Sequence, residues 1–394
     1  MIYFDWAATA LPDSGILDTV RGAEKEYFGN PSSIHQLGRK AKKFFAQSRE
    51  MLARVLGVDT TEIIFTSGGT ESNNMILFSL LARFSWKSSV KRKIVAGGIE
   101  HPSVYEPLLV LKNMGYEVVF INPNNNGYIE PEKIESSIDS QTVLVTCMHV
   151  NNETSAIQPI KQIGEIVREK EKKTGQKILF HVDAVQAFGK IPFHPYSLNI
   201  DTASVSAHKL GGSKGCGALF IKKNTPARFL FKGGEQEEKR RPGTENTAGS
   251  YSLALAAEKA VSALDKHYRK TSALMKKLIT GLVPIKGIVF IPESRREPGE
   301  GSFSPYILKI AFPGIPGEVL VRMLEEKEIF VSTGAACSSQ KKKGKHRVLQ
   351  HMGIPMRVAD SSIRISLGTK TTEEEVDFLI STLATLIPDL QKLL

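Results

Sequence analysis

The residues with the clearest chemical potential are an acid and a lysine that each follow a short apolar run. Asp183 comes directly after the run Ile178–Val182, and Lys209 lies just beyond the run Ile200–Val205. Such β-branched runs predict buried strands, and polar groups at the carboxyl ends of neighbouring parallel strands meet in one crevice. This pair suits a pyridine cofactor held as a Schiff base, in which the acid keeps the ring nitrogen protonated and the lysine carries the aldehyde carbon. Either residue alone is more often structural, as a helix cap or a solvated lysine.

A glycine-bearing turn provides a candidate site for an anion. The segment Ser67–Glu71, with the sequence SGGTE, follows a predicted strand and opens a predicted helix. Glycines let the backbone approach an anion, and a helix N-terminus offers unpaired N–H groups and a favourable dipole. Phosphate binding, with Thr70 adding its amide and hydroxyl, is one interpretation, and a plain capping box is the other. No Gly-Lys-Ser/Thr follows, so this is not a Walker A loop.

Further polar residues follow other predicted strands. His101 lies in a loop before a predicted helix, and Asn152 follows a buried strand. The polar residues at predicted strand ends, or in the loops that follow, are Thr70, His101, Asn152, Asp183, Gln186, Ser206, His208 and Lys209. In a parallel sheet these ends lie along one edge, so we expect these side chains to share a site.

Arg364 lies between two apolar strand positions in SSIRISLG. A buried arginine needs an anionic partner, because burying its charge alone is costly. Its forked guanidinium suits a substrate carboxylate, and a structural ion pair is the equally open alternative.

Three cysteines are too few and too scattered for a disulfide framework or a metal site. Cys147 and Cys216 lie in apolar runs and are expected in the core. Cys337 differs because it lies in the small polar segment TGAACSSQ, which makes it the candidate nucleophile.

Composition places the chain among ordinary globular proteins, with 394 residues of which 41% are hydrophobic and 24% charged. No apolar run approaches the ~18–20 residues of a membrane helix. The start MIYFDWAAT lacks the pattern of a signal peptide, so we expect a cytoplasmic protein without membrane attachment. The net charge of +11 suggests nucleic acid or an acidic partner. Because the charge is dispersed and no nucleic-acid-binding motif accompanies it, we expect a solvated basic surface and no direct nucleic-acid partner.

Predicted strands alternate with helices along the first part of the chain, which indicates a mostly parallel sheet covered on both faces. A long helical region follows at Tyr251–Leu282. Beyond it, strands at Ile288–Ile291, Tyr306–Phe312 and Ile363–Ser366 with separate helices indicate a smaller α+β domain. We place the boundary near residue 255, within the long helix.

Eight short motifs together resemble the cysteine desulfurase family (NifS/IscS type). In the family's order they are GGTES, IEHPS, MHVNNET, HVDAVQ, SAHK, RPGTEN, STGAACSS and SSIRISLG, so the resemblance spans nearly the whole chain. That family belongs to the class V aminotransferase-like, fold-type I enzymes that use pyridoxal 5′-phosphate. The resemblance implies an α/β fold with a large cofactor-binding domain, residues 15–255, on a mostly parallel, seven-stranded sheet. Residues 1–14 and 256–394 would form a small α+β domain that carries the cysteine loop.

Carried over by position, the resemblance implies a cofactor site. Lys209 would form the Schiff base, Asp183 would pair with the pyridinium nitrogen, and Gln186 would reach the ring hydroxyl. His101 would stack on the ring and handle protons. The remaining cofactor contacts would come from Gly69, Thr70, Asn152, Ser206 and His208, with Thr70, Ser206 and His208 on the phosphate. Thr244 in RPGTEN would reach the phosphate of the other subunit, which implies a homodimer.

The resemblance also implies the reaction. Asn152 and Arg364 would bind the carboxylate of L-cysteine, and Cys337 would accept its sulfur as a persulfide, leaving L-alanine. The sulfur would pass to an acceptor protein such as an iron–sulfur scaffold, for cluster assembly or thiolation. A selenocysteine lyase or another class V aminotransferase-like enzyme is the nearest alternative. A basic RNA- or partner-binding scaffold without catalysis is the non-enzyme alternative.

Two features depart from the family's pattern. The opening DWAATA carries Trp6 and Ala10, which leaves the contacts near Ala8 and Thr9 open. The segment Lys341–Arg347 is unusually basic. Lys341–Lys343 and His346 could supply the positive potential that activates the thiol of Cys337, but we expect them to keep the loop solvated.

Overall fold

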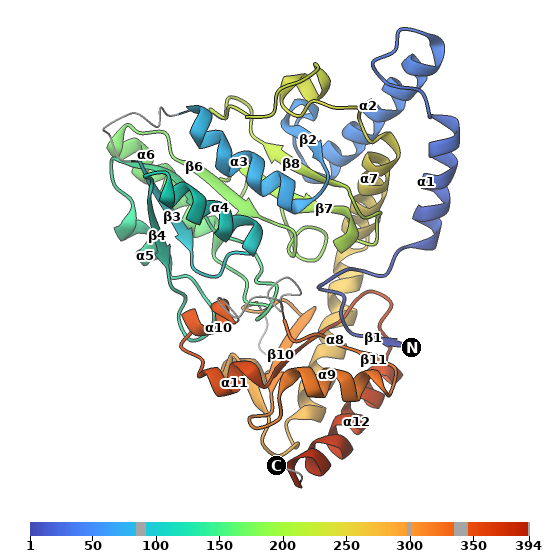
Figure 1. Ribbon diagram of the computed structural model, residues 1–394, viewed down its shortest axis with the longest axis vertical. Helices are drawn as coiled ribbons and strands as arrows, with labels where there is room; N and C mark the ends of the chain where they lie inside the picture. Colours follow the sequence, from blue (N-terminus) through green and yellow to red (C-terminus); the bar gives the residue numbers. More distant parts are fainter. Residues whose placement is uncertain (84–91, 298–300, 335–345, 393–394) are drawn as a thin grey trace.

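A seven-stranded sheet organises the larger part of the molecule (Figure 1). The computed structural model describes residues 1–83, 92–297, 301–334 and 346–392. Across the sheet the strands are β2 (Ile63–Thr66), β8 (Gly217–Ile221), β7 (Thr202–Ser206), β6 (Leu179–Asp183), β5 (Thr142–Thr146), β3 (Lys93–Gly97) and β4 (Glu117–Ile121). Six of these seven strands run in the same direction, and β8 runs opposite to them. The predicted mostly parallel, seven-stranded sheet is therefore confirmed.

Helices cover both faces of this sheet because successive strand residues point to opposite sides. One face packs on α3 (Gly69–Arg83) and α4 (Pro102–Asn113), and Ile94 and Leu144 belong to that core. The next residues along the same strands, Val95 and Val145, belong to the core on the other face. That core is shared with α2 (Gln36–Leu56), α6 (Ile160–Thr174) and α7 (Thr247–Ser262), while α5 (Pro131–Ser137) packs on α6 and α1 (Ser14–Glu26) packs on α7.

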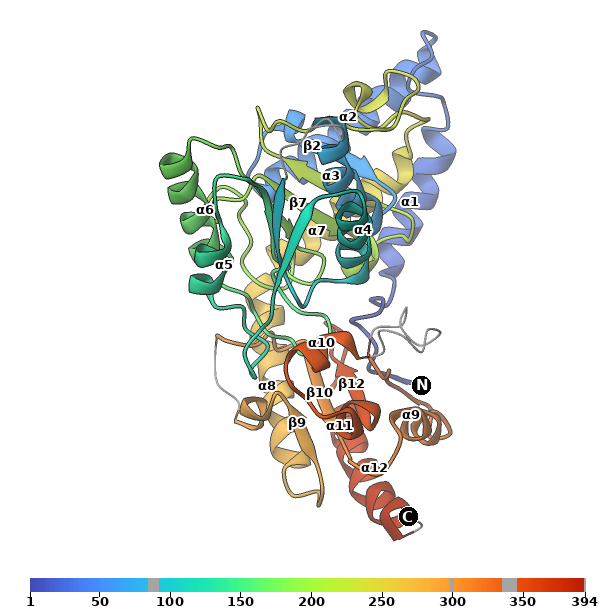
Figure 2. The same cartoon turned by 60° about the vertical axis from the view of Figure 1, so that its left-hand side comes forward.

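A smaller α+β part lies below the sheet (Figure 2). Its antiparallel sheet has the order β12 (Ser362–Ser366), β10 (Ile307–Ala311) and β9 (Val289–Ile291), and β1 (Ile2–Tyr3) pairs with β11 (Ile329–Phe330). Its helices are α8 (Leu264–Leu282), α9 (Gly317–Glu325), α10 (Arg347–His351), α11 (Met356–Asp360) and α12 (Glu373–Lys392). The N-terminal strand thus joins the C-terminal part of the chain. Among the residues that the structure describes, none of the helices is both long and apolar enough to cross a bilayer.

The long helical region is two helices, not one. Ala263 leaves the helical conformation, with φ −107° and ψ 14°, and separates α7 from α8. Because α7 packs on α1 and α2 whereas α8 packs on α12, the chain changes its packing partners at this break. The predicted boundary near residue 255 stays a prediction.

Candidate active site

The carboxyl ends of the central strands open into a cavity of about 250 Å³. Its lining includes the predicted residues Gly69, Thr70, His101, Asn152, Asp183, Gln186, Ser206, His208, Lys209 and Arg364. Thr244 is exposed and does not line this cavity. The N-terminal residues Ala7 and Ala8 do, and so does Val185. One cavity therefore collects side chains from both parts of the molecule.

One end of the cavity is suited to an anion. Gly69 opens α3, and a Cβ there would lie only 2.6 Å from Cγ2 of Val185, so only glycine fits this close approach. Thr70 in the first turn and Ser206 at the end of β7 add hydroxyl donors. Burial, reinforced by the nearby ammonium of Lys209, lowers the pKa of His208 to about 4. The anion would therefore meet N–H groups, hydroxyls and a neutral imidazole.

Both carboxylate oxygens of Asp183 accept hydrogen bonds from the protein. One carboxylate oxygen accepts from the backbone N–H of Val185 at 3.0 Å, and the other accepts from Nδ2 of Asn73 at 2.8 Å. The Oδ1 of Asn73 lies 3.0 Å from Nε2 of His181. Burial lowers the pKa of His181 to about 3, so this ring is neutral and donates to Asn73. Sequence reasoning missed Asn73, although its place four residues after Gly69, one turn into the helix, was a usable signal.

His101 is fixed as a neutral base with a defined tautomer. It caps α4, and its Nδ1 accepts the backbone N–H of Ser103 at 3.1 Å and lies 2.8 Å from that hydroxyl. Ser103, which the sequence analysis also missed, accepts from Asn73 in turn. Burial lowers the pKa of His101. Because Nδ1 accepts, the single ring proton lies on Nε2.

The amine of Lys209 contacts the N-terminal segment. Its Nζ donates to the carbonyl oxygens of Ala7 at 2.6 Å and Ala8 at 2.7 Å. Gln186 donates from Nε2 to the same Ala7 oxygen at 2.8 Å. The opening segment, whose contacts the sequence left undecided, is therefore a wall of the cavity that positions the amine.

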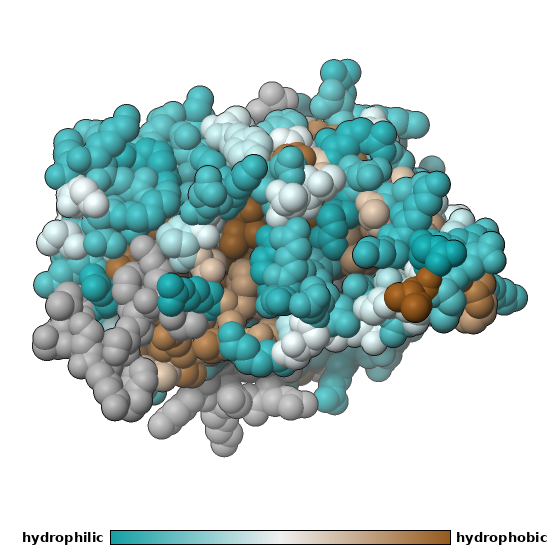
Figure 3. Space-filling model, turned by 90° about the horizontal axis from the view of Figure 1, so that it is seen from above, coloured by the Kyte–Doolittle hydropathy of each residue, from teal (hydrophilic) through white to brown (hydrophobic). Residues whose placement is uncertain are grey.

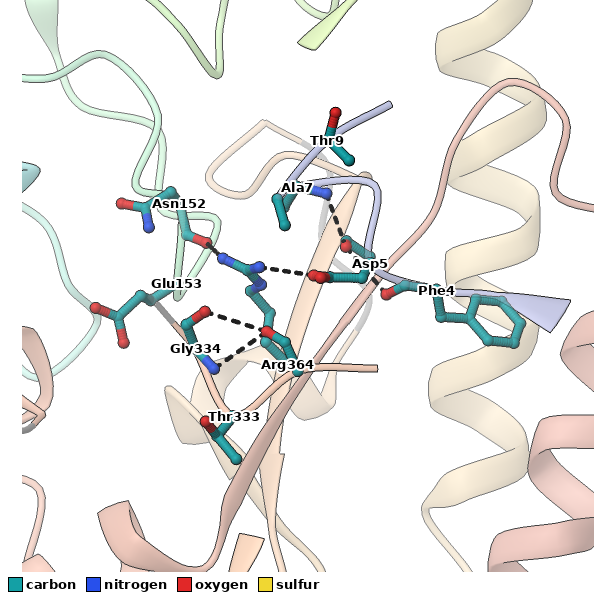
Figure 4. A network of polar contacts seen from close by, with 12 residues as sticks. Phe4, Asp5, Ala7, Thr9, Asn152, Glu153, Thr333, Gly334 and Arg364 are labelled. Atoms are coloured by element: carbon teal, nitrogen blue, oxygen red, sulfur yellow. Dashed lines mark hydrogen bonds and ion pairs between the residues drawn. The ribbon is translucent and has the colours of Figure 1, made fainter. Parts of the chain in front are cut away.

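Arg364 has a structural ion pair and also faces the cavity (Figure 4). Its Nη2 donates to Oδ1 of Asp5 at 2.8 Å, and its Nη1 donates to the backbone oxygen of Asn152 at 3.0 Å. The side chain is 2% exposed. Both interpretations left open by the sequence are therefore compatible, because the ion pair holds a guanidinium that lines the cavity and whose Nε has no hydrogen bond to any group that the structure describes.

Residues 341–345 of the basic segment lie outside the described residues, and the expectation of a solvated segment is wrong for its last residue. Arg347 donates to the backbone oxygens of Gly98 and Glu100, and its guanidinium lies 3.9 Å from the centroid of the Tyr105 ring. It therefore ties the start of α10 to the loop that carries His101.

Two of the three cysteines are described, and both are buried as the sequence predicted. Cys147 and Cys216 are both buried, which confirms that they are core residues. Burial raises the pKa of Cys216 to about 11, which makes it a poor nucleophile. Cys337 lies outside the described residues.

Comparisons with known proteins agree over the whole chain. Residues 2–379 match the family model described as aminotransferase class-V. The cysteine desulfurase IscS of Dictyoglomus turgidum is 36% identical over 392 residues, which cover 99% of this chain and 95% of that protein. A solved NifS-like protein has a TM-score of 0.89 and 37% identity, with 98% of this chain and 99% of that chain covered. The structure of SspA in complex with cysteine has a TM-score of 0.79 and 29% identity, covering 94% of this chain and 100% of that chain.

Proposed function

The chain belongs to the class V aminotransferase family and, within it, to the cysteine desulfurases, and from this premise we propose that it removes sulfur from L-cysteine. Membership confirms both the resemblance read from the motifs and the predicted fold class. The observation that carries the proposal is that one cavity brings together the carboxylate of Asp183, the amine of Lys209, the imidazole of His101 and the guanidinium of Arg364.

We infer that this cavity holds pyridoxal 5′-phosphate. The groups present fit it: a helix N-terminus with hydroxyls for the phosphate, an oriented carboxylate for the ring nitrogen, and an amine for the aldehyde. A side chain at position 69 would clash with Val185, which also lines the cavity. When bound, this cofactor supplies an electron sink that makes the Cβ–S bond of the substrate breakable.

Substrate binding and proton transfer are carried out by side chains that line the cavity. Arg364 and Asn152 hold the substrate carboxylate, and this orients Cα toward the amine of Lys209. Lys209, once free, takes the proton from Cα at its Nζ. His101 carries a proton on Nε2 that it can donate in a hydrogen bond, and its lowered pKa keeps the ring neutral beside the amine of Lys209.

Cys337 completes the reaction in this proposal, on the strength of its motif. Its thiolate attacks the sulfur of the substrate, so that an S–S bond forms while the Cβ–S bond breaks. The electron pair of the broken bond stays with the carbon, which takes a proton to give L-alanine. The enzyme keeps the sulfur as a persulfide and passes it to an acceptor protein, for which we propose an iron–sulfur scaffold or a thiolation partner.

We further propose that the working unit is a homodimer in the cytoplasm. Thr244 is exposed and does not line the cavity of its own chain, as expected for a residue that serves a partner's phosphate. Phe28 and Ile34, which are 70% and 90% exposed, lie on the connection from α1 to α2, and apolar surface is visible at this end of the molecule (Figure 3). Light scattering coupled to size-exclusion chromatography tests the dimer.

The activity is tested by measuring alanine and sulfide released from L-cysteine, with selenocysteine in parallel. We expect the purified protein to show the visible absorbance of a Schiff base, which Lys209→Ala loses. Cys337→Ala should keep the absorbance but lose sulfide release. If Cys337→Ala stayed fully active on L-cysteine, the desulfurase assignment would fail. Turnover of selenocysteine alone would favour the lyase, and a protein that binds no pyridoxal phosphate would favour the scaffold.

A further inference from the structure

A second buried lysine lies behind the cavity, and the proposed reaction does not use it. Lys190 is 9% exposed and is located in the turn that follows β6. Its Nζ donates to Oε1 of Gln186 at 2.7 Å and lies 6.0 Å from the centroid of the Tyr306 ring. Burial, with Lys209 and Arg364 nearby, lowers the pKa of Lys190 to about 7. Burying the charge of Lys190 near two other cations costs free energy, and its hydrogen bond to Gln186 offsets part of that cost.

The hydrogen-bond partner of Lys190 is the side-chain amide of Gln186, whose oxygen accepts and whose nitrogen donates. Lys190 donates to the oxygen of the Gln186 amide, and its protonated form, which is the main form below pH 7, can only donate and so requires that oxygen to face it. On the other side, Nε2 of Gln186 donates to the carbonyl oxygen of Ala7 at 2.8 Å, and a carbonyl can only accept. Both neighbours therefore impose the same orientation on the amide. The amide nitrogen carries two N–H groups, and Gln186 lines the cavity, so the second N–H is available to a guest.

We infer that Lys190 is a positioning residue that holds the Gln186 amide with its N–H, not its oxygen, toward the ring oxygen of the cofactor. This inference rests on the proposed function. Without Lys190 only the carbonyl of Ala7 would hold the amide in this orientation, and in the fraction of molecules in which the amide turned over, its oxygen would face an electron-rich ring oxygen. The cofactor would then lose a charge-assisted hydrogen bond and gain a repulsion.

The test is the dissociation constant of pyridoxal phosphate, measured by visible absorbance titration of the apoenzyme. Lys190→Met should weaken binding roughly 10-fold or more, as expected for one hydrogen bond to a charged group. Lys190→Arg keeps a donor-only cation and should restore most of the affinity. The matched control is Lys93→Met, a partly buried lysine at the start of β3 that pairs with Asp139 and does not line the cavity. It should bind the cofactor as the wild type does.

A double-mutant cycle separates positioning from a purely structural or electrostatic role. If Lys190 acts through Gln186, then Lys190→Met has no further effect in a Gln186→Ala background. An equal loss in both backgrounds, or wild-type affinity in Lys190→Met, overturns the inference. Thermal unfolding of each apo variant verifies the fold, and Lys190→Gln replaces the Met variant if that one does not fold. A wild-type chain that binds no pyridoxal phosphate instead refutes the proposed function.

Discussion

The proposed carboxylate-binding role of Arg364 leads to a quantitative prediction. The guanidinium is 2% exposed and is aimed into the cavity by its bonds to Asp5 and to the backbone of Asn152. Replacement of Arg364 by Met removes the cation while keeping an unbranched side chain. A hydrogen bond to a charged group contributes about 1.5–3 kcal/mol, and about 1.4 kcal/mol corresponds to a factor of ten. We therefore expect kcat/KM for L-cysteine to fall roughly 10- to 150-fold.

The assay must show that the loss belongs to the substrate carboxylate. Cysteamine, which is cysteine without the carboxylate, should inhibit the wild type and Arg364→Met with the same inhibition constant. The variant also leaves Asp5 without its partner, although that side chain is 22% exposed and can be partly hydrated. Asp5→Asn combined with Arg364→Met controls for this, and it should show the same loss on L-cysteine. If cysteamine binding fell as much as cysteine turnover, the substrate-binding role of Arg364 would be refuted.

Two further predictions concern stability. Lys309, which is fully buried, donates to the backbone oxygen of Thr333 at 3.0 Å and lies 3.6 Å from a carboxylate oxygen of Glu153. Lys309→Met should cost about 3–5 kcal/mol in the free energy of unfolding by urea, because it leaves a buried carboxylate unpaired, whereas adding Glu153→Gln should recover most of that loss. A double variant as unstable as the single one would contradict this. Burial, with the Asp183 carboxylate nearby, raises the pKa of Glu100 to about 8 from 4.5, so the folded state keeps a proton that the unfolded state releases. The contribution of Glu100 to stability is present below pH 4.5 and is lost as the pH rises through 8. Between these two pH values, the free energy of unfolding of Glu100→Gln relative to wild type should therefore rise by about 1.4 kcal/mol per pH unit. A difference that does not change with pH would count against the raised pKa.

The strand-end residues were predictable because they obey local rules. An apolar run followed by a polar residue marks the end of a buried strand, and a parallel sheet brings such ends to one edge. Asp183, Lys209 and His101 were located in this way, and the cavity contains all three. The SGGTE turn likewise marked the start of α3, because glycines and capping residues indicate where a helix begins from only a few neighbouring residues.

The residues that orient this chemistry were not predictable, because their partners are far away along the chain. Asn73 and Asp183 are 110 residues apart, and Asp5 and Arg364 are 359 residues apart. Nothing local distinguishes Lys190 from a solvated lysine, since only its burial against Gln186 gives it a role. The sequence by itself determined which polar residues follow the strands and line the cavity, because side-chain type and strand periodicity are local properties. Only the tertiary structure decided which way the amides, imidazoles and guanidinium point, because a hydrogen bond depends on which distant segment packing brings within about 3 Å.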